Sequence, residues 1–98
     1  MSEIKWLPEA LAGIERLYEF LNSKNPQAAM RAADLILQSA DLLHINPAIG
    51  RPMADDTGRR EWFISFGAGA YVLRYILADE NTVVIIRVWH SRESRGDK

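Results

Sequence analysis

The strongest constraint on the fold lies in residues 59–90, where two short turn-like stretches separate three runs of β-branched, aromatic and other apolar residues. Runs of this composition predict β-strands, and short turns between them predict antiparallel pairing. We therefore expect a three-stranded meander. Arg74 and Arg87 stand inside two of these runs, so each either lies on a solvated face of the sheet or marks a binding surface.

The composition restricts the class of protein. The chain has 98 residues and no cysteine, so we expect one domain over residues 1–98 without disulfides or thiolate metal sites. No signal peptide is visible, and no apolar run approaches the ~20 residues of a membrane helix. With the lack of cysteine, we expect a cytoplasmic protein. The two histidines, His44 and His90, are too few to bind a metal unaided, and we expect no cofactor.

The charge is balanced overall but differs between the two halves. Residues 1–58 carry five Lys and Arg and eight Asp and Glu, whereas residues 59–98 carry seven and five, and the net charge is −1. General nucleic-acid binders are usually strongly basic. This balance argues against direct DNA binding.

Two helices are expected before the meander. Residues 3–7 predict a short first strand, Pro8 suits the first turn of a helix, and Asn25 with Pro26 suits the N-cap and first turn of a second helix. Apolar residues then recur at helical spacing. The predicted inner faces are Leu11, Ile14, Tyr18 and Leu21, widened by Ala10 and Leu17, in the first helix, and Ala29, Ala33, Ile36, Ala40 and Leu43 in the second.

Residues 46–58 form a predicted linker, because they include two prolines and two glycines and show no periodicity. The expected order of elements is β-α-α-β-β-β. This order predicts an α+β fold in which a helical hairpin packs on one face of the sheet.

A choice of turns fixes the register of the meander. With turns at residues 67–70 and 78–81, alternation assigns one wholly apolar face to the core. This predicted core face holds Trp62, Ile64, Phe66, Tyr71, Leu73, Tyr75, Leu77, Val84, Ile86 and Val88. The predicted open face holds Glu61, Phe63, Ser65, Val72, Arg74, Ile76, Val83, Ile85, Arg87 and Trp89. An apolar face studded with arginine predicts a protein partner.

The chain resembles the RelE/ParE toxin superfamily of bacterial toxin–antitoxin systems. The matching segments are Trp6-x-Pro8-x-Ala10-x-x-x-Ile14, Ile49-Gly50-Arg51-Pro52, Arg60-Glu61-Trp62-Phe63-Ile64-x-Phe66, Tyr71-Val72-Leu73-Arg74-Tyr75 and Arg87-Val88-Trp89-His90-x-Arg92-Glu93. They occur in order over nearly the whole chain. The resemblance implies a helical hairpin on a curved, mostly antiparallel sheet, in which the first strand joins the C-terminal strands.

The resemblance implies a toxin of a type II system but leaves its target open. ParE-like members inhibit DNA gyrase, whereas RelE-like members cleave mRNA on the ribosome. The Gly-Arg-Pro linker, the Arg-Glu-Trp-Phe-Ile strand and the modest charge are more similar to ParE. The implied partners are gyrase and a cognate ParD-like antitoxin, which binds the toxin in a hetero-oligomer. The alternatives are an mRNA interferase and an inactive homologue that only binds antitoxin.

Two sets of residues are candidates for the site. A nuclease needs a cation for the phosphate and groups that transfer protons. Arg74, Arg87 and His90 are the candidates for these roles, with Glu61 as an alternative base, although the register places His90 on the opposite face from both arginines. Alternatively, the two arginines pair with Glu61 or with an acidic segment of the antitoxin. The candidates for binding the antitoxin or the target are Glu61, Phe63, Arg74, Ile85, Arg87, Trp89 and Arg92.

Overall fold

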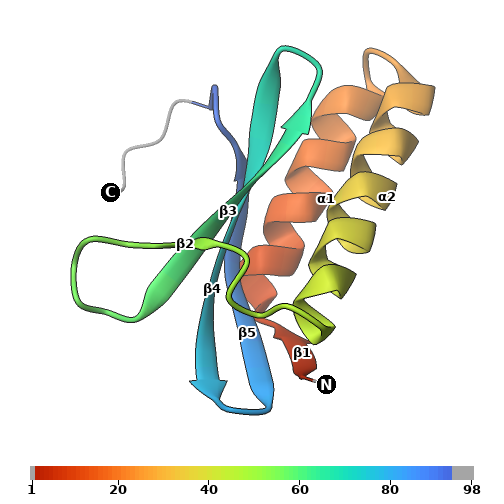
Figure 1. The fold of residues 1–98 in the computed structure, drawn as a ribbon. Coiled ribbons are helices and arrows are strands. Elements are labelled where there is room, and N and C mark those ends of the chain that lie inside the picture. Colours follow the sequence, from red (N-terminus) through yellow and green to blue (C-terminus); the bar gives the residue numbers. More distant parts are fainter. Residues whose placement is uncertain (1, 94–98) are drawn as a thin grey trace.

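A five-stranded sheet with two helices on one face forms the fold (Figure 1), seen in a computed structural model that describes residues 2–93. The strand order is β1-β5-β4-β3-β2. Only β1 and β5 pair in parallel, and the other neighbours are antiparallel. The elements are β1 (Glu3–Trp6), α1 (Pro8–Asn22), α2 (Pro26–Asp41), the 3-10 turn η1 (Leu42–His44), β2 (Arg51–Pro52), β3 (Arg59–Phe66), β4 (Gly69–Asp79) and β5 (Thr82–His90). The predicted α+β class, the helical hairpin and the position of the first strand are confirmed.

Both helices begin where the sequence predicts. Pro8 is the first residue of α1, and Pro26 is the first residue of α2. The Asn25 side chain accepts a hydrogen bond of 3.2 Å from the Ala28 N–H, so it satisfies one of the free donors at the start of α2.

The inner face of α1 agrees with the prediction in part, and that of α2 mostly agrees with it. In α1, Ala10 and Leu17 lie in the core and Ile14 and Leu21 pack against it. Helix α1 buries Ala10, Gly13 and Leu17, whereas Leu11 and Tyr18 are 52% and 36% exposed. The helix is turned in this way because its small residues face β5 at close range. A Cβ added to Gly13 would lie 2.4 Å from the Val88 carbonyl oxygen, so only glycine fits at this contact.

The register of β5 also differs from the prediction, and it places Ile85 in the core. Ala78 is bulged out, so Leu77 lies opposite Val83, and the faces are reversed over the first half of β5. Val83 and Ile85 are fully buried in the core, whereas the predicted core residues Val84 and Ile86 are half-buried.

A second bulge restores the predicted faces further along β5. Ile86 has no partner in β4 between the pairs Tyr75–Ile85 and Arg74–Arg87, so Val88 returns to the core face. The β3–β4 turn is shorter than predicted, with Phe66 opposite Gly69, but this shift of two residues leaves the faces of both strands unchanged.

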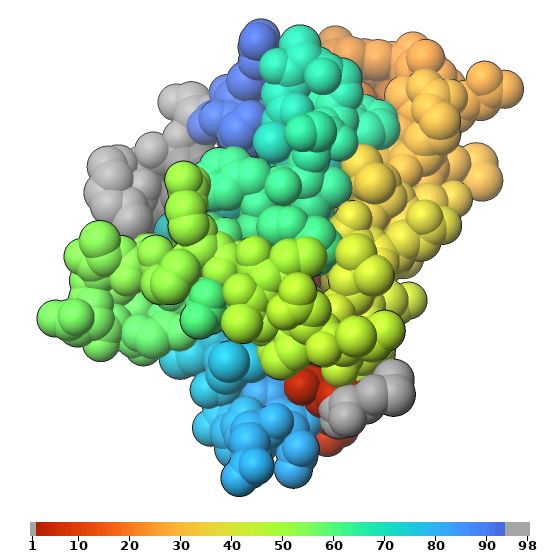
Figure 2. Space-filling model, viewed as in Figure 1, coloured from red at the N-terminus to blue at the C-terminus, as the bar shows by residue number. Residues whose placement is uncertain are grey.

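The linker between α2 and β3 is anchored to the sheet by Tyr75 and Arg60. The Tyr75 hydroxyl accepts from the Gly50 N–H and donates to the Pro47 carbonyl, both at 2.8 Å. Arg60 donates to the carbonyls of Gly50, at 2.7 Å, and Ala48, at 3.2 Å. The linker includes the short strand β2, which the sequence did not predict, and Figure 2 shows it lying across the front of the molecule and projecting to one side.

We predict that Gly13→Ala destabilises the fold by about 1–3 kcal/mol, because the added methyl overpacks the contact with β5. A loss of stability would be informative, because replacing glycine by alanine inside a helix ordinarily stabilises a protein by roughly 1 kcal/mol. Urea unfolding followed by circular dichroism measures the difference. The control is Ala12→Ser at the neighbouring exposed position, where we expect about 0.5 kcal/mol or less. Equal or higher stability of Gly13→Ala would contradict the contact.

Candidate functional site

A row of charged residues crosses four strands on the face of the sheet that the helices leave uncovered. The register pairs Arg51 with Glu61, Glu61 with Arg74, and Arg74 with Arg87. Arg74 lies between the core residues Leu73 and Tyr75 in sequence, so its side chain points to the opposite face. We call these four residues the charged row. Arg51, whose role the sequence left unresolved, belongs to it because β2 extends the sheet beyond β3.

Arg74 is held in place from two sides. Its Nε and Nη2 donate to the same Glu61 oxygen, Oε2, at 3.0 and 2.7 Å. Its Cζ lies 4.9 Å from the ring centroid of Trp89, within the range of a cation–π contact. Only 7% of Arg74 is exposed, so the ion pair with Glu61 neutralises a charge that is nearly out of solvent.

Phe63, Val72 and Trp89 form an apolar row beside the charged row. Phe63 is 44% exposed, and the Arg51 guanidinium lies over its ring, 4.9 Å from the ring centroid. Trp89 was predicted to lie on an uncovered face, but it is 6% exposed, and Val72 is fully buried. The most exposed part of this face is therefore its β2–β3 edge, where Arg51 and Phe63 lie, while Arg87 on β5 is half-buried.

The remaining candidates lie elsewhere. His90 pairs with Tyr71, on the helix side of the sheet, and Arg92 follows in the turn after β5. The His90 Nδ1 accepts from the Arg92 N–H at 3.1 Å. Of the three nuclease candidates, the structure therefore brings Arg74 and Arg87 together and separates His90 from them. Ile85, in the core, is not a surface residue.

An ion pair that the sequence did not reveal joins α1 to the end of β5. The Arg16 guanidinium donates to both oxygens of Glu93, at 3.1 and 2.9 Å. The two residues are 77 positions apart in sequence, so no local pattern could predict the pair. Burial opposes ionisation of Glu93, but the hydrogen bonds from Arg16 and from the His90 N–H outweigh it and lower the pKa of this carboxyl below its usual value.

The described residues contain neither a metal-binding cluster nor a membrane-spanning helix. Within residues 2–93, no three His, Asp or Glu side chains are grouped so that they could bind a metal ion. No helix in the same part of the chain is long and apolar enough to cross a membrane.

Comparison with known proteins identifies the family of this chain. The model of the ParE toxin of the type II toxin-antitoxin system parDE matches residues 4–95. The chain therefore belongs to the ParE toxin family, and it is the toxin of a type II toxin–antitoxin system.

Two similar proteins are also named toxins, and a solved structure shares the fold. The chain is 38% identical over 95 residues to Toxin RelE3 of Caulobacter vibrioides, covering 97% of this chain and 100% of the relative. It is 39% identical over 80 residues to Toxin RelE1 of the same organism, covering 82% and 83%. A chain of the chromosomal ParDE system of P. aeruginosa shares the fold, with a TM-score of 0.72 at 21% identity, covering 90% of this chain and 94% of the other.

We predict that Glu61→Gln lowers the free energy of unfolding by about 1–3 kcal/mol, because it leaves the buried Arg74 guanidinium without its counter-charge. Chemical denaturation measures the change. The matched control is Asp55→Asn, which removes the acidic partner of Arg59 from an exposed ion pair and should have a much smaller effect. Equal effects of the two substitutions would show that the Glu61–Arg74 pair has no special role.

Proposed function

We propose that this toxin inhibits DNA gyrase by protein contact and does not cleave RNA. The observation that carries the proposal is the separation of Arg74 from His90. RNA cleavage needs a cation at the phosphate and a proton-transfer group in one site. Here His90 lies on the other side of the sheet. The alternative base, Glu61, is held in an ion pair with Arg74, which is itself stacked on Trp89. The target is cytoplasmic, and we place the toxin in the same compartment.

The mRNA interferase remains the second candidate. Two observations favour it: the curated relatives are named RelE toxins, and the charged row sets three arginines side by side across the sheet. The third candidate, an inactive homologue that only binds antitoxin, is favoured by the neutralisation of Arg74 by Glu61.

We propose that the antitoxin binds the outer side of the helical hairpin. Leu11, Tyr18 and Leu37 line a shallow apolar groove there with Pro8 and Ile14. Leu37 is 46% exposed, and such a groove suits the apolar face of an amphipathic helix. The same chain would continue to the Arg51–Phe63 edge, where acidic and apolar side chains would complement the arginine and the aromatic ring.

An in vitro contrast distinguishes the two targets. We expect the purified toxin to inhibit supercoiling of relaxed plasmid by gyrase and to leave a reporter mRNA intact in a translating extract. Toxin that is first mixed with its antitoxin is the control, and it should be inactive in both assays. Ribosome-dependent cleavage of the mRNA, abolished by Arg74→Ala, would contradict the proposal. Inactivity in both assays would favour the inactive homologue.

A second prediction tests the antitoxin groove. We expect Leu37→Asp to weaken antitoxin binding by about tenfold or more, because it places a charge in an apolar contact. The control is Met30→Asp, also on α2 and exposed but outside the groove, which should bind normally. Isothermal titration calorimetry measures both affinities. Equal affinities for the two variants would move the antitoxin site elsewhere.

A further inference from the structure

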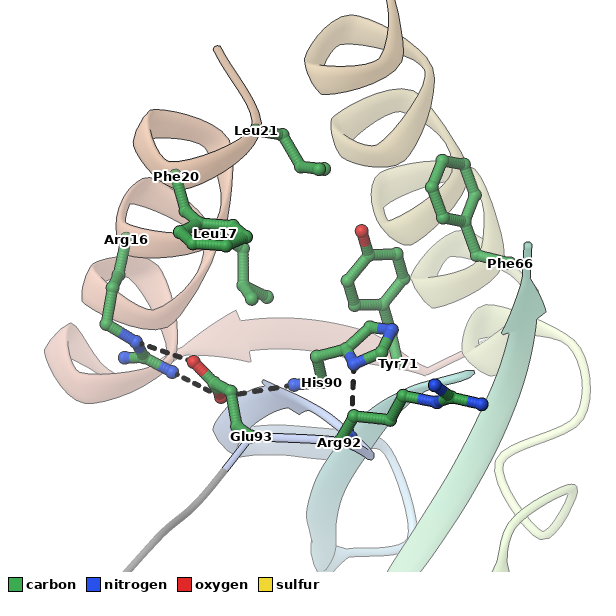
Figure 3. Close-up of a pocket in the computed structure, with 9 residues that line it drawn as sticks. All are labelled: Arg16, Leu17, Phe20, Leu21, Phe66, Tyr71, His90, Arg92 and Glu93. Atoms are coloured by element: carbon green, nitrogen blue, oxygen red, sulfur yellow. Dashed lines mark hydrogen bonds and ion pairs between the residues drawn. The ribbon is translucent and has the colours of Figure 1, made fainter. Parts of the chain in front are cut away.

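A cavity of about 510 Å³ lies between α1 and the end of the β3–β4–β5 meander. Figure 3 shows its lining, with Leu17, Phe20 and Leu21 from α1 on one side and Phe66 on the other. The cavity is mostly apolar and has a few polar groups at one end, which is the usual composition of a small-molecule site, and its volume lies in the usual range. It is separate from the charged row and from the hairpin groove.

The Tyr71 hydroxyl is the feature that points to a ligand. Tyr71 is 2% exposed, and its ring packs 5.3 Å from the rings of Phe66 and His90. Its hydroxyl makes no hydrogen bond in the described structure. Fully buried polar atoms of the described residues all have partners, so this oxygen is reached through the cavity. Figure 3 shows the hydroxyl pointing into the space between Leu21 and Phe66.

In the free protein this hydroxyl bonds to water in the cavity, so a ligand that enters must offer it a polar group in place of that water. Burial raises the pKa of Tyr71 above its ordinary value, so the hydroxyl stays protonated at neutral pH. It therefore offers a donor and an acceptor to a polar group inside the cavity.

The polar end of the cavity carries a net positive charge. Arg16 and Glu93 neutralise each other, and Arg92 adds a positive charge. The Arg92 guanidinium makes a single hydrogen bond within the described residues, a long one of 3.4 Å to Ala68. The His90 Nδ1 accepts from the Arg92 N–H, so in the neutral ring the proton lies on Nε2, which is a donor. These groups suit an anion.

We propose that this pocket binds a small organic acid with a carboxylate at one end, an apolar body and an oxygen at the far end. The carboxylate would lie at Arg92 and His90, the body among Leu17, Phe20 and Phe66, and the far oxygen at the Tyr71 hydroxyl. This ligand site is separate from the surface proposed to bind the target. It would make the toxin responsive to a metabolite of this class.

Calorimetry with the full chain and two matched probes tests the proposal. The probe 3-(4-hydroxyphenyl)propionate has both polar ends, whereas 3-phenylpropionate lacks the far oxygen. We expect a Kd of about 0.1–1 mM for the first, from ordinary ligand efficiency, and binding about three- to tenfold weaker for the second. The amine 4-hydroxyphenethylamine, with the opposite charge, should not bind.

Variants locate the site. Tyr71→Phe removes a hydroxyl that bonds to nothing, so the fold should persist, and binding of the hydroxylated probe should weaken about three- to tenfold while the other probe is unaffected. Arg92→Gln should weaken both acids about tenfold, whereas Arg31→Gln, the same change on the exposed face of α2, should weaken neither. Thermal unfolding checks that each variant folds.

The proposal would be overturned by the absence of saturable binding below about 10 mM, by binding that is unchanged in both Tyr71→Phe and Arg92→Gln, or by equal binding of the amine. Binding of a peptide ending in tyrosine, with no binding of the free acids, would also overturn it and would assign the pocket to a protein partner.

Discussion

The close packing of α1 on β5 determines which faces of the molecule reach solvent. Gly13 lies against the backbone of Val88 at a distance that admits no side chain. This contact turns Ala10 and Leu17 inward and leaves Leu11 and Tyr18 on the outside of the hairpin. It also brings Arg16 within reach of Glu93, so the same contact positions one wall of the cavity.

Because the helices cover one face of the sheet, the charged row can lie on the other face. The charged row extends across four strands because the register places Arg51, Glu61, Arg74 and Arg87 side by side. Two of these residues neutralise each other in partial burial, which fixes their geometry. Arg51 stays at the accessible edge above Phe63. A rigid Glu61–Arg74 pair beside the accessible, positively charged Arg51 is suited to recognising a protein surface.

The sequence was sufficient for the two helices, the first strand, the meander and their order, because proline, the Asn25 cap and hydrophobic periodicity act locally. Prediction from the sequence failed where packing between distant segments determines which face of an element is buried. The bulge at Ala78 reverses the faces of β5 until the one at Ile86 restores them, so Ile85 was assigned to the wrong face. The face of α1 depended on a close approach that periodicity does not encode. Within the site, alternation did place Glu61, Arg74 and Arg87 on one face, with His90 on the other.

Short-range patterns also could not reveal the strand β2 or the Arg16–Glu93 pair. Strand β2 has two residues and exists because Tyr75 and Arg60 anchor the linker beside β3. Both features depend on contacts between residues that are far apart in the chain. They matter for function because strand β2 adds Arg51 to the charged row, and the Arg16–Glu93 pair lines the polar end of the cavity.

The most direct test of the account is to induce this toxin alone in a bacterial host and to follow DNA and protein synthesis by labelled precursor uptake. Inhibition of gyrase by protein contact predicts an early fall in DNA synthesis with filamentation, while protein synthesis continues. An immediate fall in protein synthesis would contradict the account, and it would make Arg74 and Arg87 candidates for a nuclease site.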